Sequence, residues 1–175
     1  LATRMRMYAN HGALKKHQHQ MEGINSRLDG MQAAILTAKL PHIHVWTKRR
    51  QQVASWYDTA LSNVRGIERP RVRQGATHVY HLYVVQTNHR DRLASCLQDH
   101  GIQTGIHYPA ALPFLDAYSY LTVDRDSNFP VAKRNATRIL SLPIYPELSK
   151  QEVDHIAGLI IRWCGTHKEV KADCR

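Results

Sequence analysis

Residues 23–36 read GINSRLDGMQAAIL, a polar turn that leads directly into an amphipathic helix. From Leu28 onward the apolar residues recur at helical rather than strand spacing, at Met31, Ile35 and Ala38. Ser26 is predicted to cap this helix, and Asp29 three residues later completes a carboxylate variant of the capping box. The pattern therefore predicts a helix that begins near Ser26.

The same turn offers several groups that could bind an anion. The first turn of a helix has unpaired backbone N–H groups and the positive end of the helix dipole. Asn25 adds a side-chain donor beside that end, and Arg27 adds a fixed positive charge. The residues alone leave two interpretations open: an ordinary capped helix or a phosphate-binding corner.

The turn and helix resemble the DegT/StrS family of pyridoxal-phosphate-dependent (PLP-dependent) nucleotide-sugar aminotransferases, through the pattern G-x-N-x-R-x-D followed by Q-A-A. Further matches follow in family order and spacing over residues 1–164: His11-Gly12, His19, Lys39-Leu40-Pro41, Arg49, His78, residues 81–85, Asp91-Arg92, His107-Tyr108-Pro109, Phe129-Pro130 and Ser141-Leu142-Pro143. Their order and spacing together make the resemblance specific. It implies the small C-terminal α+β domain of a fold type I PLP-dependent transferase, preceded by a long interdomain helix.

The sequence pattern divides the chain into four segments. Residues 1–22 read as the end of a helix and a polar loop, which the resemblance makes a remnant of the large-domain edge. Residues 23–64 form the long interdomain helix, which should bend or restart at Pro41 because proline removes an internal hydrogen bond. Residues 65–165 form the small α+β domain, and residues 166–175 are a charged tail.

Within residues 65–165 we expect a few strands with helices against one face. Residues 79–86 are a continuous apolar run, predicted as a strand covered on both faces. Residues 102–108 are predicted as a second strand and residues 139–142 as a third, with helices over residues 90–100 and from Pro130. Ser149 and Glu152 form a full capping box at the start of the last helix.

His107 and Tyr108 are a second candidate site. They end a predicted strand at the point where Pro109 forces the chain to leave it, so two hydrogen-bonding side chains could project into a cleft. Their polar ends could equally meet backbone groups at a buried strand end. By the resemblance, this segment lines the substrate side of the active site, and we assign His107 and Tyr108 to substrate contact.

The resemblance also gives roles to the residues of the turn. Asn25 matches the asparagine that reaches the cofactor phosphate of the neighbouring subunit, which implies a homodimer with a shared active site. Arg27 matches the adjacent arginine and is expected near phosphate or paired with a carboxylate such as Asp29. His17 stands where the family often has tyrosine, so an aromatic stacking role there is in doubt.

Composition bounds the remaining classes of function. The three cysteines, Cys96, Cys164 and Cys174, are widely spaced without a C-x-x-C pair, which argues against a disulfide framework and for a cytoplasmic setting. No apolar run approaches the ~18 residues of a membrane span. The histidines lack acidic neighbours at ligand spacing, so no metal site is expected. The net charge of +10 would favour binding to nucleic acid, but the sequence contains no recognisable nucleic-acid-binding motif.

The expected function follows from the resemblance. In the complete protein, an amino group would move from an amino acid, glutamate in our reading, through pyridoxal 5'-phosphate to a nucleotide-linked keto-sugar, for amino-sugar or polysaccharide biosynthesis. The family's Schiff-base lysine belongs upstream of this sequence, so the chain is expected to be a C-terminal portion that is inactive alone. The alternatives are a sugar dehydratase of the same family and a basic regulatory or nucleic-acid-binding module.

Overall fold

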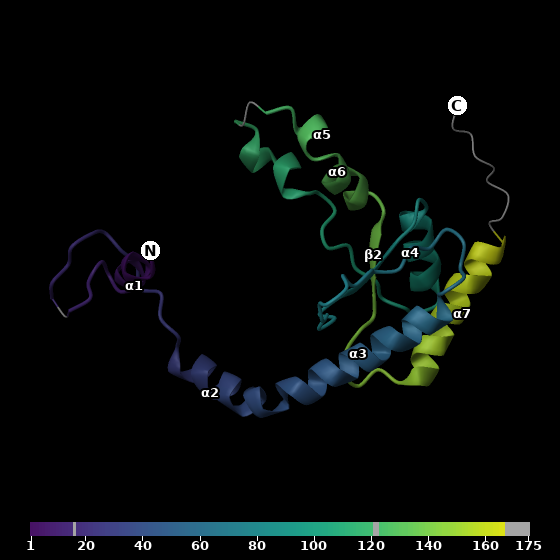
Figure 1. The fold of residues 1–175 in the computed structure, drawn as a ribbon, viewed down its shortest axis with the longest axis horizontal. Helices are drawn as coiled ribbons and strands as arrows, with labels where there is room; N and C mark the ends of the chain where they lie inside the picture. Colours follow the sequence, from purple (N-terminus) through teal and green to yellow (C-terminus); the bar gives the residue numbers. More distant parts are fainter. Residues whose placement is uncertain (16, 121–122, 167–175) are drawn as a thin grey trace. The chain divides into compact units, whose positions relative to one another are not determined.

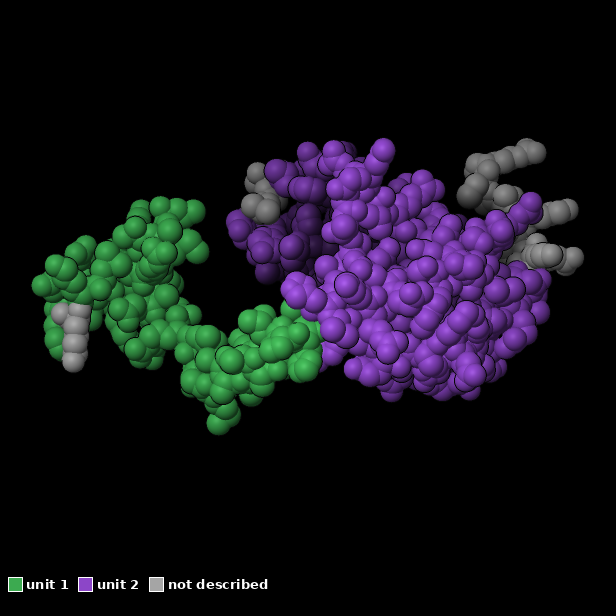
Figure 2. Space-filling view, turned by 60° about the horizontal axis from the view of Figure 1, so that its bottom comes forward, with its two compact units in different colours: residues 1–43 green, residues 44–175 purple. Residues whose placement is uncertain are grey.

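A computed structural model describes residues 1–15, 17–120 and 123–166. The chain forms two compact units, residues 1–43 and residues 44–175 (Figure 2). The boundary falls at the beginning of helix α3, Ile43–Ala60 (Figure 1). Each unit is described separately below.

The first unit contains two helices joined by a folded loop. Helix α1, Ala2–Ala9, is followed by isolated β-bridges that pair Asn10 with Asn25 and Ala13 with His19. Helix α2, Gly30–Lys39, continues into a 3₁₀ turn, Leu40–His42. The expected interruption at Pro41 is confirmed, because this residue lies inside the 3₁₀ turn between α2 and α3.

The predicted cap of α2 is wrong by three residues. Asp29, not Ser26, is the N-cap residue, and its Oδ1 accepts hydrogen bonds from the backbone N–H groups of Met31 at 2.8 Å and Gln32 at 3.4 Å. The N–H of Ser26 instead donates to the carbonyl of Ala9 at 2.9 Å. Pairing with the end of α1 therefore keeps Ser26 in the extended loop, and the helix begins only at Gly30.

The second unit is built around a two-stranded antiparallel sheet. Strand β1, Tyr83–Gln86, pairs with β2, Ile139–Leu142, so that Tyr83 lies opposite Leu142 and Gln86 opposite Ile139. Helices α4, Arg90–Asp99, and α7, Lys150–Thr166, pack against each other (Figure 1). The buried core draws on α3, both strands, α4 and α7, and its fully buried side chains include Val53, Tyr57, Leu61, Tyr83, Val85, Leu93, Leu97, Leu140, Val153 and Ile160.

The rest of the second unit is a long segment with short helices. The 3₁₀ turns Leu112–Phe114 and Asp116–Tyr118 precede helices α5, Arg125–Asn128, and α6, Pro130–Ala136. Helix α6 leads directly towards β2, which forms over the predicted residues.

Two strand predictions need correction. The run over residues 79–86 forms a strand only from Tyr83, with alternating burial. Tyr80 has a positive φ of 49°, which is outside the strand conformation, and its N–H donates to His78 Nδ1 at 2.8 Å. Residues 102–108 do not form a strand, and their backbone pairs with β2 only at the bridge between Gly105 and Ser141. That bridge has N–H to O distances of 3.1 and 2.7 Å, and the chain then turns away into the loop before Pro109.

The capping box of α7 is confirmed. The Ser149 N–H donates to Glu152 Oε2 at 2.8 Å, while the Glu152 N–H donates to Ser149 Oγ at 3.3 Å. The flanking residues Leu148 and Val153 are both buried, as expected of a hydrophobic staple.

Candidate functional site

Asn25 and Arg27 lie together on the surface of the first unit. The Arg27 Nε donates a hydrogen bond of 2.9 Å to Asn25 Oδ1, and both side chains are exposed. The predicted alternative, a pairing of Arg27 with Asp29, is not the arrangement found among the described residues, because the Asp29 carboxylate caps α2. The contact uses the Asn25 side-chain oxygen and the Arg27 Nε, so the Asn25 amide nitrogen and the guanidinium Nη groups take no part in it.

The helix N-terminus itself contributes less to this corner than the sequence suggested. The Asp29 carboxylate already accepts hydrogen bonds from the N–H groups of Met31 and Gln32. Its negative charge would repel a second anion at that point. Anion binding here therefore depends on the two side chains, Asn25 and Arg27. The sequence pattern did not reveal this, because Ser26 also has the composition of a helix cap.

The loop beneath the corner is held by close backbone packing. The His11 N–H donates to the Ile24 carbonyl at 3.0 Å, and the Ile24 N–H donates to the Tyr8 carbonyl at 2.7 Å. A Cβ on Gly23 would lie 2.3 Å from the backbone nitrogen of Gly12, so only glycine permits this approach. His19 Nδ1 is hydrogen-bonded to the His11 carbonyl at 2.7 Å and so helps to hold the loop.

The second candidate pair lies in the second unit. His107 Nδ1 and Ser141 Oγ are hydrogen-bonded at 2.9 Å, and Ser141 on β2 is only 5% exposed. The neighbouring Tyr108 is 73% exposed. The polar end of His107 thus meets a buried hydroxyl within its own unit, whereas Tyr108 presents its ring to the outside.

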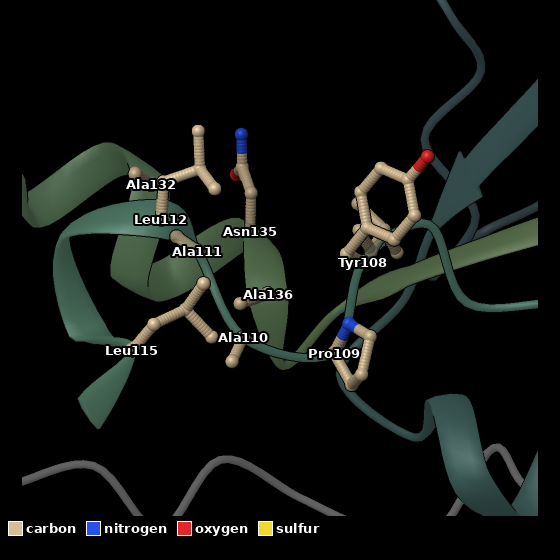
Figure 3. Close-up of a pocket in the computed structure, with 10 residues that line it drawn as sticks. Tyr108, Pro109, Ala110, Ala111, Leu112, Leu115, Ala132, Asn135 and Ala136 are labelled. Carbon is tan, nitrogen blue, oxygen red and sulfur yellow. The ribbon is translucent and has the colours of Figure 1, made fainter. Parts of the chain in front are cut away.

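Tyr108 forms one wall of a cavity of about 490 Å³. The loop after Tyr108 and the start of β2 supply part of the lining, and α6 supplies the facing wall (Figure 3). The lining residues are Tyr108, Pro109, Ala110, Ala111, Leu112, Leu115, Ala132, Asn135, Ala136 and Ile139. Sequence reasoning missed the α6 residues. It recognised the helix start at Pro130, but no polar motif marks the face formed by Ala132, Asn135 and Ala136.

The largest pKa shifts belong to the core and not to either candidate site. Burial raises the pKa of Tyr57 and Tyr83 far above the usual range, and the Asp58 hydrogen bond adds to the shift of Tyr83. Both hydroxyls therefore remain donors, from Tyr57 to the Pro143 carbonyl at 3.1 Å and from Tyr83 to Asp58 Oδ1 at 2.7 Å. These bonds hold α3 against β1 and the segment after β2.

Two further kinds of site are absent from the described residues. Within residues 1–15, 17–120 and 123–166, no three histidine, cysteine or acidic side chains gather closely enough to hold a metal ion. None of the helices described there combines the length and apolarity that a bilayer crossing requires.

The sequence matches the DegT/DnrJ/EryC1/StrS aminotransferase family over residues 1–161. The chain belongs to this family. It is 42% identical to the erythromycin biosynthesis sensory transduction protein EryC1 of Saccharopolyspora erythraea, over 91% of this chain and 43% of that protein. It is 37% identical to the dTDP-3-amino-3,4,6-trideoxy-alpha-D-glucose transaminase of Streptomyces venezuelae, over 93% of this chain and 43% of that enzyme.

Solved structures of the family share the fold. DesV of S. venezuelae superposes with a TM-score of 0.86 at 36% identity, over 93% of this chain and 44% of that chain. A family aminotransferase from Brucella abortus superposes with a TM-score of 0.85 at 33% identity, over 94% of this chain and 43% of that chain. The predicted fold class, the C-terminal α+β part of a fold type I transferase, is therefore confirmed. The chain spans less than half the length of these relatives.

Proposed function

We propose that this chain is the C-terminal part of a PLP-dependent aminotransferase that moves an amino group from glutamate to a nucleotide-linked keto-sugar. The observation that carries the proposal is the family match over residues 1–161, together with relatives named as nucleotide-sugar transaminases. The proposed division of the chain is a large-domain edge over residues 1–22, an interdomain segment over 23–64 that is helical from Gly30 to Ala60, a small domain over 65–165 and a tail.

The turn residues suit the phosphate of the cofactor. Asn25 offers an exposed amide and Arg27 an exposed, permanently charged guanidinium, and their mutual hydrogen bond orients both. In the proposed assembly they bind the phosphate of pyridoxal 5'-phosphate held by a second protomer. When bound, this cofactor supplies the electron sink that amino transfer requires.

The substrate side is assigned to the second unit. The bond from His107 to the buried Ser141 hydroxyl fixes the imidazole, and Tyr108 places its ring and hydroxyl beside the cavity. We propose that these two side chains bind and orient the sugar nucleotide. The chain alone is proposed to be inactive, because none of its lysines lies in the family motif that links the cofactor.

The surface of α2 supports the proposal of a homodimer. No residue of α2 is buried, and the exposed fractions are 75% for Met31, 53% for Ile35 and 56% for Leu36. Contiguous exposed apolar side chains of this kind mark association surfaces. A second copy of the complete protein would cover them and would bring the Asn25 corner to the partner's cofactor.

The proposal is tested with a fusion protein, in which the N-terminal part of the EryC1 relative precedes this chain and supplies the segment that the match does not cover. The fusion should bind pyridoxal 5'-phosphate, seen as visible absorbance, and release 2-oxoglutarate from glutamate when a keto-sugar nucleotide is added. Asn25→Ala should weaken cofactor binding at least tenfold, while the exposed Asn63→Ala should leave it unchanged.

Three results would contradict the proposal. Unchanged cofactor affinity in Asn25→Ala would remove the phosphate role. Sugar dehydration without consumption of an amino donor would favour the dehydratase alternative. Salt-dependent binding of duplex DNA by a fusion that ignores the cofactor would favour the nucleic-acid alternative.

A further inference from the structure

A single hydrogen bond joins His107 to Ser141, and its direction decides what His107 can do. The two atoms, His107 Nδ1 and Ser141 Oγ, lie 2.9 Å apart. A neutral imidazole has one N–H donor and one acceptor nitrogen, whereas a hydroxyl can both donate and accept. Either the hydroxyl donates to Nδ1 and the ring proton lies on Nε2, or Nδ1–H donates to Oγ and Nε2 is an acceptor.

The surroundings of Ser141 favour the first direction. Ser141 is buried in β2, and its backbone N–H and carbonyl are both bonded to Gly105. Within the residues that the structure describes, His107 Nδ1 is the one partner found for the hydroxyl. If Nδ1–H donated, the hydroxyl proton would be buried without an acceptor, and a buried donor without an acceptor is costly. If the hydroxyl donates, its proton is satisfied.

The imidazole is also held by its neighbours. A Cβ at Gly105 would lie 2.6 Å from His107 Cε1, so there is no room for a side chain between this backbone and the ring. The rings of His107 and Tyr108 meet edge to face, with their centroids 5.7 Å apart. These contacts keep Nδ1 turned to Ser141. Nε2 therefore lies on the opposite side of the ring, in a side chain that is exposed.

We propose that Ser141 is a positioning residue that holds neutral His107 as the Nε2–H tautomer, so that His107 offers the substrate a hydrogen-bond donor and not a base. The step to the substrate rests on the proposed function, which places the sugar nucleotide beside His107. An uncharged, fixed N–H selects an acceptor oxygen of the ligand and cannot remove a proton from it. His107 thus binds and orients, and proton transfer falls to other groups of the complete protein.

The chain contains its own references for the test, because backbone partners fix the tautomers of two other histidines. His78 Nδ1 accepts from the Tyr80 N–H at 2.8 Å, so the proton of the neutral ring must lie on Nε2. His100 Nδ1 is bonded to the Cys96 carbonyl at 2.8 Å, and a carbonyl only accepts, so this Nδ1 must carry the proton. His107 should resemble His78 and differ from His100.

The tautomer is measured by NMR on the 175-residue chain with ¹⁵N-labelled histidine. Long-range ¹H–¹⁵N spectra at about pH 8, where histidine side chains are ordinarily neutral, show which ring nitrogen carries the proton. The His107 signals are identified as those lost in His107→Gln. We expect the Nδ1 shift of His107 to match that of His78, with the Nε2–H form in at least tenfold excess.

Three serine variants test the role of the hydroxyl. Ser141→Ala removes it, so the Nδ1 shift of His107 should move towards that of His100 as the two tautomers mix. Ser141→Thr keeps a hydroxyl and should keep the shift. Ser62→Ala removes the hydroxyl of an exposed serine in the same unit and should change nothing. Unchanged His78 and His100 signals show that a variant is folded, and the unaltered chain decides the tautomer even if Ser141→Ala does not fold.

The role of the donor is tested in the fusion with a keto-sugar nucleotide. His107→Gln keeps an amide N–H but cannot act as a base, whereas His107→Leu removes both functions. The glutamine variant should keep a kcat/KM at least tenfold above that of the leucine variant. Ser141→Ala should raise KM more than it lowers kcat, because the interaction that it weakens serves binding.

Two NMR results would overturn the inference: a protonated Nδ1 on His107 in the unaltered chain, or a tautomer that a folded Ser141→Ala leaves unchanged. Equal loss of kcat/KM in His107→Gln and His107→Leu would overturn the donor role. Failure of the proposed function would look different. A fusion without amino transfer contradicts that function alone, because the tautomer is measured without cofactor or substrate.

Discussion

Gly105 controls the position of the His107 imidazole, so its replacement tests the architecture of the substrate side. A Cβ at Gly105 would lie 2.6 Å from His107 Cε1, about 0.8 Å inside the 3.4 Å at which ordinary contact begins. The backbone of Gly105 does not have a positive φ, so alanine fits the local conformation. Gly105→Ala should therefore displace the imidazole and leave the bridge to Ser141 in place.

Displacing the imidazole changes the free energy of unfolding, because it breaks the hydrogen bond to Ser141. Loss of the 2.9 Å bond leaves the Ser141 hydroxyl, 5% exposed, without its partner, at a cost of about 1–3 kcal/mol. Replacing glycine by alanine also restricts the unfolded chain, which stabilises the fold by about 0.4–1 kcal/mol. Gly105→Ala should thus lower the free energy of unfolding by about 1 kcal/mol.

The decisive assay is a double-mutant cycle measured by urea unfolding. In the His107→Ala background the bond to Ser141 is already absent and the clash is removed, so Gly105→Ala should stabilise the chain by about 0.4–1 kcal/mol. The same substitution should therefore change sign between the two backgrounds. Equal effects in both backgrounds would refute the proposed contact between Gly105 and the imidazole.

Three further predictions concern the two helix starts and the exposed surface of α2. Asp29→Ala should destabilise the first turn of α2 by about 1 kcal/mol, seen as faster amide exchange at Met31, whereas Ser26→Ala should not. The hydrogen bond from the Ser149 hydroxyl holds the pKa of Glu152 below its ordinary 4.5. The Glu152 carboxylate therefore contributes stability above pH 4.5, and this contribution is lost as the pH falls through the lowered pKa. Glu152→Gln should flatten this part of the acid unfolding curve. Ile35→Glu should leave the stability of this chain within about 0.5 kcal/mol, but should weaken self-association of the fusion in analytical ultracentrifugation.

The sequence predicted those elements whose signals are local and complete. The capping box of Ser149 and Glu152 and the apolar stripe behind it are self-contained, so the start of α7 follows from a few adjacent residues. Residues 139–142 were predicted equally well, because β-branched and apolar residues stop at Pro143. At the start of α7 the neighbours in sequence are also the partners in space, whereas β2 is marked by its own apolar residues although it pairs with the distant strand β1.

The failures occur where a distant partner decides the structure. Ser26 has the composition of a helix cap, but its N–H is bonded to Ala9, and no local pattern reveals that pairing. Residues 102–108 have strand composition, yet their backbone pairing with β2 is limited to the bridge at Gly105. The pairing of Arg27 with Asn25 instead of Asp29 follows from the same shift of the cap. The cavity was missed because alanines on α6 carry no chemical signature by themselves.

The exposed surface of α2 and the Asn25 corner belong to one short segment, and this has a consequence for assembly. A ten-residue helix that buries none of its side chains gains little from packing and depends on its cap, so it should open readily in the isolated chain. Under the proposed function, the second protomer would cover the apolar side chains of α2 and bind at Asn25 in the same event. Amide exchange at Ala33 and Ala34 should therefore slow at least tenfold in the dimeric fusion, and Ile35→Glu should restore fast exchange even when the cofactor is present. Slow exchange in a monomeric fusion would show that the N-terminal part of the same protomer, and not the partner, covers this helix.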